Sequence, residues 1–237
     1  MNEKAYLAAF DPQDYPPVLV MVDAALFTFH EGRLLLLLVK RSNHPDMGKW
    51  SLPGGFVNPD QDKSLEDTVN RKLLEKTGVT PPYLEQLLTI GNDGRDKRGW
   101  SVTVCYTALI AHQKCAPGID TVSDARWVGV DALDDVDLAF DHRWVIAQAR
   151  ERLKQKALYS IVPAYALPEK FTLPELQRIH EILIGKPLQK KSFRRRIEQA
   201  ELLLDTGLKR QEGGRPAALY KMRARSGRFT FVRNLEE

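Results

Sequence analysis

Residues 54–79 read GGFVNPDQDKSLEDTVNRKLLEKTGV, and this stretch decides the fold of the 237-residue chain. Two glycines close a short apolar segment, and apolar residues then recur every four positions from Leu65 to Leu73. That spacing predicts an amphipathic helix with Ser64 as its N-cap and Gly78 as its C-cap. The stretch is therefore expected to form a glycine turn, a polar loop and a helix.

Apolar and β-branched runs around this stretch predict a mixed sheet. Strands are expected at residues 18–29, 34–39, 50–56, 89–92, 101–110 and 125–130. A second helix is expected to begin at Asp141, as its N-cap, and to end near residue 157. Its core-facing residues are expected to be Trp144, Ala147 and Leu153. Strands combined with two helices favour an α/β layered domain over residues 1–157.

A new helical pattern begins after a proline-bounded connector at residues 158–170. Thr172 and Glu175 have the spacing of a capping box, in which each side chain bonds the backbone amide of the other residue. Gly185 is expected to end the helix that they open. This helix would be the first of a helical C-terminal domain.

A second helix is expected to open at Ser192 and to stop at Gly207. Its apolar face is expected to consist of Phe193, Ile197, Ala200 and Leu204. A β-hairpin is expected next, with residues 208–210 and 218–222 as strands around the turn GGRP. Helix, turn, helix and hairpin form the layout of a winged helix–turn–helix domain over residues 171–237.

Positive charge is concentrated in this C-terminal domain. Residues 186–228 contain 13 Lys and Arg against 4 Asp and Glu, whereas the rest of the chain is acidic. A basic helix near Ser192 and a glycine-rich hairpin tip suit phosphate and groove contacts with double-stranded DNA. The alternative is a solvated charge run on a surface helix. The candidate DNA-binding residues are Lys190, Lys191, Ser192, Arg194, Arg195, Arg196, Lys209, Arg210, Arg215 and Pro216.

The composition argues against several classes of protein. The longest aliphatic run, residues 34–39, is too short to span a bilayer, and the N-terminus lacks the apolar core of a secretion signal. Cys105 and Cys115 do not suggest a disulfide framework or a zinc site. A cytoplasmic protein with no membrane partner is therefore expected.

The loop and helix of residues 54–79 resemble the Nudix box, G-x5-E-x7-R-E-U-x-E-E-x-G-U, where U is aliphatic. The resemblance covers roughly residues 18–157, and it implies a Nudix α/β/α sandwich. Its best-matching positions are Pro53, Gly54, Gly55, Arg71, Leu73, Glu75, Gly78 and Val79. In that family the glutamates hold Mg²⁺ or Mn²⁺ against a diphosphate and help to activate water.

Lysines occupy two of the three glutamate positions on the helix. The glutamate after the arginine is Lys72, the second of the paired glutamates is Lys76, and Glu75 alone remains. The loop is also two residues longer than the pattern, so the early glutamate position falls on Gln61 or Lys63.

This exchange of charge predicts that the chain holds no catalytic metal and is not an enzyme. Lys72 and Lys76 lie four residues apart and share a helix face, where each repels a cation. A like charge at 4 Å costs about 4 kcal/mol at an effective dielectric constant of ~20. The two lysines either contact a diphosphate directly or lie on a solvated face.

Candidate effector-binding residues surround the glycine turn. Arg41 ends a core strand, and the loop NDGRDKRGW places arginines beside an aromatic ring, which suits phosphate pairing and base stacking. The alternative is an ordinary solvated loop. The candidates are Arg41, Gly54, Gly55, Phe56, Lys72, Lys76, Arg95, Arg98 and Trp100.

The whole chain is similar to the Nudix-related transcriptional regulators of NAD metabolism. The similarity is carried by VKRSNHP at residues 39–45, RGWSVTVCYTAL at 98–109, LAFDH at 138–142, and SFRRR at 192–196 with GRPA in the wing. It implies an ADP-ribose effector that is bound without hydrolysis, and no cofactor. It also implies a homodimer that binds a near-palindromic operator and represses genes of NAD synthesis or salvage.

Two other functions fit parts of the sequence. An active hydrolase of ADP-ribose or related nucleoside diphosphates would show Mg²⁺-dependent turnover, which Lys72 and Lys76 argue against. A DNA-binding protein whose Nudix domain serves only as a dimerisation platform would not bind ADP-ribose.

Overall fold

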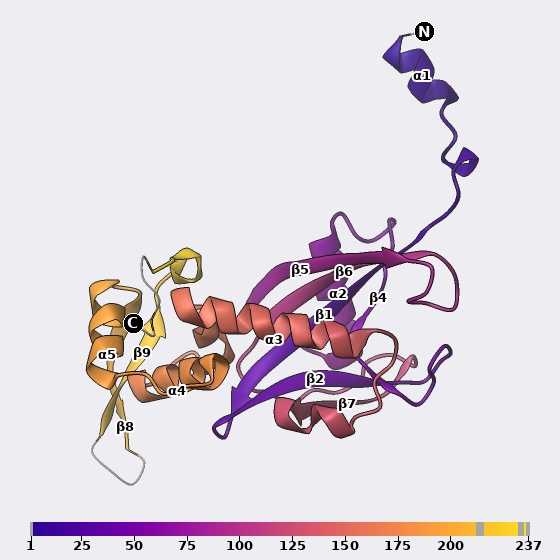
Figure 1. Ribbon diagram of the computed structural model, residues 1–237. Coiled ribbons are helices and arrows are strands. Elements are labelled where there is room, and N and C mark those ends of the chain that lie inside the picture. The colour runs from indigo at the N-terminus through magenta and orange to yellow at the C-terminus, as the bar shows by residue number, and fades with distance from the viewer. Residues whose placement is uncertain (1, 212–215, 232–234, 236–237) are drawn as a thin grey trace.

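The computed structural model describes residues 2–211, 216–231 and 235. It consists of an α/β/α layered body followed by a smaller module of helices and a two-stranded sheet (Figure 1). Two short N-terminal helices, α1 (Glu3–Ala9) and η1 (Pro12–Asp14), bury no residue and extend away from the body. Within the described residues, no helix is both long enough and apolar enough to cross a membrane.

A seven-stranded mixed sheet forms the centre of the body. Its strands are β1 (Leu19–His30), β2 (Arg33–Arg41), β3 (Trp50–Ser51), β4 (Gly54–Phe56), β5 (Tyr83–Asn92), β6 (Ser101–Leu109) and β7 (Val122–Gly129). The order is β3-β2-β1-β6-β5, with β4 paired to β1 and β7 paired to β2. Among the described strand pairs of this sheet, β1 and β6 run parallel and the others antiparallel, which confirms the expected mixed sheet.

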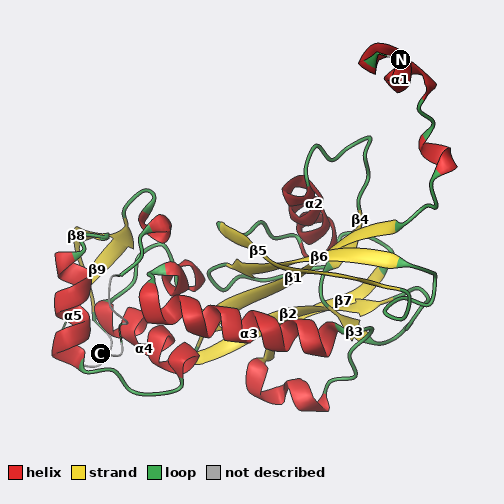
Figure 2. Ribbon diagram, turned by 45° about the horizontal axis from the view of Figure 1, so that its top comes forward, coloured by secondary structure: helices red, strands yellow, loops and turns green. Residues whose placement is uncertain are grey.

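Alternate residues of β1 point to opposite faces of the sheet, as the period of a strand requires. Ala24 and Leu26 belong to one apolar cluster, which includes α2 (Leu65–Thr77). Ala25 and Phe27 belong to another, which includes α3 (His142–Tyr159). The sheet therefore lies between the two helices (Figure 2).

The caps of α2 are those expected from its sequence. The Ser64 hydroxyl accepts a hydrogen bond from the Asp67 amide at 3.1 Å, and Gly78 ends the helix in the left-handed conformation. One strand is longer than expected, because β5 begins at Tyr83 and not at residue 89. Its first half is only partly buried and contains a register shift between Gln86 and Leu88, so its apolar alternation is weak.

The core-facing side of α3 was predicted in part wrongly. Trp144 is 51% exposed and Ala147 is also exposed, whereas Leu153 is buried as expected. The buried face consists of Val145, Ile146, Ala149, Leu153 and Ala157. Apolar residues occur on both sides of this helix, so spacing alone did not identify the face that packs. Asp141 stands at the N-cap position but makes no side-chain cap bond.

The C-terminal module contains the winged helix–turn–helix layout. Its elements are α4 (Leu173–Ile184), α5 (Lys190–Gln199), β8 (Leu203–Arg210) and β9 (Ala217–Met222), followed by η4 (Ser226–Arg228). The capping box of α4 is present, with Thr172 and Glu175 bonding each other's amides, and Gly185 ends the helix.

The bounds of α5 differ from the expectation. The helix begins at Lys190, two residues before Ser192, because the Gln189 side chain caps it. It ends at Gln199, well before Gly207, and Leu204 lies in β8. Gly207 has a φ of +72° and lies where the β8–β9 pairing shifts register, so this glycine forms a bulge and does not end a helix.

Most of the segment between the two parts is buried, although residues 168–170 are exposed. Its short helix η3 (Val162–Ala166) packs into the apolar cluster that contains Phe27 of β1 and Phe193 of α5. The layered body and the C-terminal module therefore share one continuous core. The remaining short helix, η2 (Val130–Asp135), follows β7.

Candidate functional site

A cavity of about 330 Å³ opens between the glycine turn, one face of α2 and the loop after β5. Five cationic side chains and two carboxylates line it. These are Arg41, Lys72, Lys76, Arg95 and Arg98 with Asp23 and Asp96, joined by Met21, Asn43, His44, Leu52, Gly54, Gly55, Phe56, Ile119, Thr121, Phe140 and His142. The volume and the cationic lining suit a small anionic ligand.

The glycine turn brings backbone close to the cavity wall. A Cβ at Gly54 would lie 2.3 Å from the Val22 carbonyl oxygen and 2.4 Å from Asp23 Oδ1. Only glycine therefore fits between β4 and β1. Gly55 faces the aliphatic stem of Lys72, which a Cβ would meet at 3.1 Å.

Glu75, the glutamate that remains at the three motif positions, is paired with two cations. Lys72 Nζ lies 3.0 Å from Glu75 Oε2, and Arg71 Nη1 lies 3.0 Å from Glu75 Oε1. Burial alone would raise the pKa of Glu75, but these two cations lower it. Across the part of the chain that the structure describes, no three His, Cys, Asp or Glu side chains gather as metal ligands do.

The lengthened loop before α2 is held by a carboxylate, Asp62, that lies outside the Nudix-box positions. Asp62, which lies between Gln61 and Lys63, accepts a hydrogen bond of 2.7 Å from Arg71 Nε and another from Thr68 at 2.8 Å. Its side chain is 2% exposed, and the Arg71 hydrogen bonds lower its pKa. Arg71 thus fixes the loop against α2.

Lys76 is the cavity lysine that keeps its charge available for a ligand. In contrast to Lys72, it makes no ion pair within the described residues. Burial, with the nearby Lys72 and Arg41, lowers its pKa to about 8, although Asp23 and Glu75 oppose this shift. An anion in the cavity would stabilise the protonated amine.

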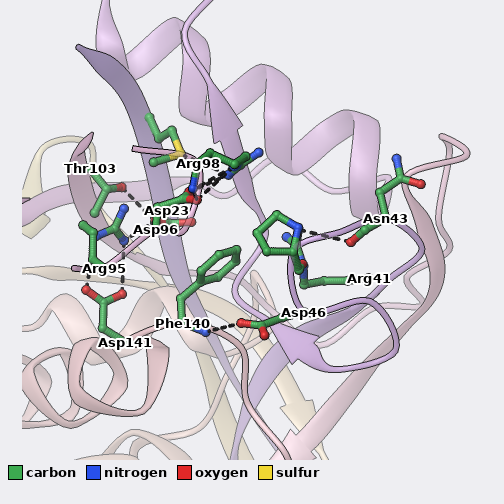
Figure 3. A network of polar contacts seen from close by, with 12 residues as sticks. Asp23, Arg41, Asn43, Asp46, Arg95, Asp96, Arg98, Thr103, Phe140 and Asp141 are labelled. Carbon is green, nitrogen blue, oxygen red and sulfur yellow. Dashed lines mark hydrogen bonds and ion pairs between the residues drawn. The ribbon is translucent and has the colours of Figure 1, made fainter. Parts of the chain in front are cut away.

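A buried carboxylate of β1 organises the opposite wall, as Figure 3 shows. Asp23 Oδ2 accepts a hydrogen bond from the Thr103 hydroxyl at 2.7 Å and lies 3.6 Å from Arg95. His142 Nε2 lies 3.5 Å from Asp23 Oδ1. Burial would raise the pKa of Asp23, but His142, Thr103 and Arg95 together lower it. Arg95 in turn binds both oxygens of Asp141 at 3.1 and 3.2 Å.

These network residues were absent from the set of candidates, with the exception of Arg95. One signal in the sequence is an acidic residue, Asp23, within a mostly apolar strand, and Thr103 and His142 lie in the family-like stretches at 98–109 and 138–142. Its partners Thr103 and His142 lie on other elements of the fold, so their meeting is a result of the topology.

The other expected effector residues divide into two groups. Arg98 binds Asp96 at 2.6 Å and lies over the Phe56 ring at 4.7 Å, and both Arg98 and Phe56 line the cavity. Arg41 lies 4.7 Å from the Phe140 ring centroid (Figure 3). Trp100 does not line the cavity, because it is 49% exposed and contacts Gly91.

The expected DNA-binding residues lie mainly on α5, whose Phe193 and Ile197 are buried against α4 and β9. Lys190, Lys191 and Arg195 are exposed, whereas Ser192, Arg194 and Arg196 are partly buried. Lys190 and Arg194 line a groove of about 540 Å³ between α5, the start of α4 and β9, and Pro216 closes it. The groove therefore presents two cations beside the first turn of a helix.

The hairpin residues are placed differently from one another. Lys209 is exposed on β8. Arg210 is not directed outward, because it binds Glu175 at 2.7 Å and the Lys170 carbonyl at 3.1 Å. Arg215 lies outside the described residues.

The fold and these two sites define a Nudix domain joined to a DNA-binding winged helix. Residues 19–149 match the family model of the NUDIX domain, and residues 163–222 match that of the NrtR DNA-binding winged helix domain. The chain is 45% identical over 235 residues to the ADPR responsive transcriptional repressor NtrR of Acinetobacter baylyi, covering 99% of this chain and 94% of that protein. The chain therefore belongs to the NrtR family.

Solved structures of one family member support the same assignment. Shewanella oneidensis NrtR in complex with a 27mer DNA is 61% identical, with a TM-score of 0.86 over 92% of this chain and 99% of that one. The NUDIX domain of the same protein in complex with ADP ribose is 56% identical, with a TM-score of 0.63 over 65% of this chain and 99% of that one.

Proposed function

We propose that this protein is an ADP-ribose-responsive transcriptional repressor of NAD biosynthesis or salvage genes. The cationic cavity binds the effector, and the winged helices of a homodimer bind a near-palindromic operator. The single observation that supports this most strongly is that a cation-lined cavity, with lysines in place of the motif's carboxylates, shares one core with a winged helix module. Of the relatives named above, the Shewanella oneidensis protein forms complexes with DNA and, through its NUDIX domain, with ADP ribose, and the Acinetobacter protein is named an ADPR responsive repressor.

Different cavity residues contact different parts of ADP-ribose. Lys76 and Lys72 face the side of α2 on which hydrolases of this fold hold metal, so they contact the diphosphate. Arg41 and Arg98 extend the positive lining beside the Phe140 and Phe56 rings, where a base stacks. The cavity carboxylates, Asp23 and Asp96, are suited to accept hydrogen bonds from the ribose hydroxyl groups, because an ionised carboxylate only accepts.

The cavity binds ADP-ribose but does not hydrolyse it. Hydrolysis in this fold needs a divalent cation to polarise the diphosphate and to activate water. Glu75 already forms ion pairs with Arg71 and Lys72, and Lys72 and Lys76 repel a cation. The alternative of an active hydrolase lacks the ligands that this chemistry requires.

On the DNA side, the exposed cations of α5 enter a major groove. Lys191 and Arg195 project from its outer face, and Lys190 with Arg194 lies beside the wing, where a phosphate backbone passes. A dimer places two such helices about one helical turn of DNA apart.

The test combines binding and turnover on the full-length protein. An operator is obtained by selection from random duplexes, and its affinity is measured by fluorescence anisotropy with and without ADP-ribose, with AMP and ribose 5-phosphate as controls. ADP-ribose is expected to weaken operator binding, and no AMP is expected to form with Mg²⁺ or Mn²⁺. Mg²⁺-dependent turnover would instead support a hydrolase. Calorimetry that detects no ADP-ribose binding would leave the Nudix domain as a dimerisation platform.

A further inference from the structure

The first residues of α3 contact the effector cavity, and its last residues contact the C-terminal module. At its start, Asp141 binds Arg95, and His142 both lines the cavity and approaches Asp23. His142 Nδ1 accepts a hydrogen bond from the Leu52 amide at 3.0 Å, so its proton lies on Nε2 and faces the Asp23 carboxylate. A ligand that approaches Asp23 or Arg95 therefore meets the first turn of α3.

The far end of α3 is attached to the C-terminal module through its backbone. The last four carbonyls of a helix have no partner within it and need one from elsewhere. Ser160 bonds the Lys156 carbonyl at the end of the helix. The next three carbonyls are all bonded by residues beyond residue 170. Ala157 is bonded by His180 Nδ1 at 2.9 Å, Leu158 by the Leu235 amide at 2.6 Å and Tyr159 by the Phe231 amide at 2.7 Å.

His180 connects this helix end to α5. A carbonyl oxygen only accepts, so Nδ1 of His180 carries the proton and donates it to Ala157. The ring also packs edge-on against Phe193 of α5, with centroids 5.4 Å apart. Both residues are fully buried, and Nε2 has no hydrogen-bond partner within the described residues. Burial lowers the pKa of His180 to about 4, so the ring is uncharged at neutral pH.

A purely structural role does not account for this histidine. An acceptor left without a partner in a core costs free energy, which an apolar side chain of similar size would avoid. A leucine at position 180 would lack the hydrogen bond that His180 donates to the Ala157 carbonyl of α3. The histidine is thus the residue through which the position of α3 acts on Phe193, which lies between the α5 residues Ser192 and Arg194.

The helix between these ends can act as a rigid body. It has 18 residues, a length of about 27 Å. Its buried face packs against β1 on one side and α4 on the other within one core, and close-packed cores shift as units. Figure 1 shows α3 running along the sheet to the C-terminal module, and the cavity-lining His142 is its first residue.

We propose that α3 couples the effector cavity to α5, and that His180 is the positioning residue at the joint. This inference rests on the proposed function, since it concerns how one ligand changes the affinity for the other. Effector contact with the Asp23–His142–Arg95 network shifts the first turn of α3, and the three capped carbonyls transfer that shift to the winged helix. The ligand acts because it binds the two positions of α3 with different affinity.

The experiment measures one ratio, the operator Kd with saturating ADP-ribose divided by the Kd without it. The wild-type ratio is expected to be on the order of 5 to 150, the usual range of such coupling. His180→Leu is expected to reduce the ratio towards 1, while each ligand alone binds within about threefold of wild type. His180→Asn, whose amide reaches the Nδ1 position, is expected to keep the ratio. A loss of stability alone would lower the affinities and the Tm, and would not remove the ratio selectively.

A second pair of variants tests the helix and does not touch the core. Arg150 and Lys154 are exposed on α3, so Arg150→Gly with Lys154→Gly softens the helix, and the double alanine variant is its matched control. The glycine pair is expected to lower the ratio by at least threefold, and the alanine pair to preserve it. If His180→Leu does not fold, the comparison of the glycine pair with the alanine pair tests the coupling role of α3 on its own.

The possible results separate the two levels of the argument. A wild-type ratio of 1 would reject the proposed function and this inference with it. A clear wild-type ratio that His180→Leu and the glycine pair both leave unchanged would overturn the coupling role of α3 alone.

Discussion

Raising the pH should weaken ADP-ribose binding through Lys76. The pKa of this amine is about 8 in the free protein, because burial and the charges of Lys72 and Arg41 oppose protonation. A bound diphosphate favours the charged amine and raises its pKa in the complex. The contribution of Lys76 to affinity is therefore fully present below pH 8, and it is lost as the pH rises through 8 towards the pKa of the complex.

The size of the effect follows from the protonated fraction. With a pKa of about 8, the amine is ~90% protonated at pH 7 and ~10% protonated at pH 9. The Kd for ADP-ribose is thus expected to rise about tenfold between these values, or ~1.4 kcal/mol. Neither the diphosphate nor the adenine of the ligand titrates in this window.

Isothermal titration calorimetry at constant ionic strength measures this directly. Repeating the titration at pH 8 in buffers of different ionisation enthalpy should reveal an uptake of about half a proton for each ligand bound. Lys76→Gln is expected to lose about 1.5–3 kcal/mol of affinity at pH 7 and to have no pH dependence. Lys63→Gln, an exposed lysine at the start of the same motif, is the control and should behave as wild type. A Kd that is flat from pH 7 to 9, or a tenfold rise that persists in Lys76→Gln, would refute the reasoning.

Three further predictions concern the winged helix and the glycine turn. Arg195→Ala should weaken specific operator binding by about 1–3 kcal/mol, whereas Arg194→Ala should weaken specific and random DNA alike and reduce the salt slope by about one, as measured by anisotropy over a salt series. Arg210→Ala should lower the Tm by removing the contact with the start of α4, yet should alter DNA affinity less than Arg195→Ala does. Gly54→Ala should cost about 1–3 kcal/mol or more in urea unfolding, because its Cβ would lie 2.3 Å from a carbonyl oxygen of β1. Gly94→Ala, where the nearest atom is 3.7 Å away, is the tolerated control.

The sequence predicted those features whose causes are local. The α2 helix was identified because its caps, Ser64 and Gly78, and its four-residue spacing lie within one segment. The capping box at Thr172 was identified in the same way. Lys72 and Lys76 were found from one aligned motif, and both side chains line the cavity.

Features that depend on distant contacts were not predicted. The end of α5 was placed too late, because the apolar residues near Leu204 fit a helix face as well as they fit a strand paired with β9. Asp23 could not be identified as the centre of a network, since Thr103, Arg95 and His142 reach it only after β1, β6 and α3 have come together. The bonds from His180 and Phe231 to α3 likewise join segments with no shared pattern.

In the proposed function, binding without hydrolysis and the attachment of α3 to the C-terminal module depend on each other. If the bound effector were hydrolysed, the fraction of occupied cavities would depend on the rate of hydrolysis. It would then no longer depend only on the effector concentration and the Kd. Without a metal cage, occupancy follows mass action, and the free energy of diphosphate binding is available to shift an equilibrium between two positions of α3. Coupling of this kind is reciprocal, so bound operator must weaken ADP-ribose binding by the same factor by which ADP-ribose weakens operator binding. In this proposal, lysine in place of glutamate on α2 both disfavours a catalytic cation and makes the cavity suitable as the input of a switch.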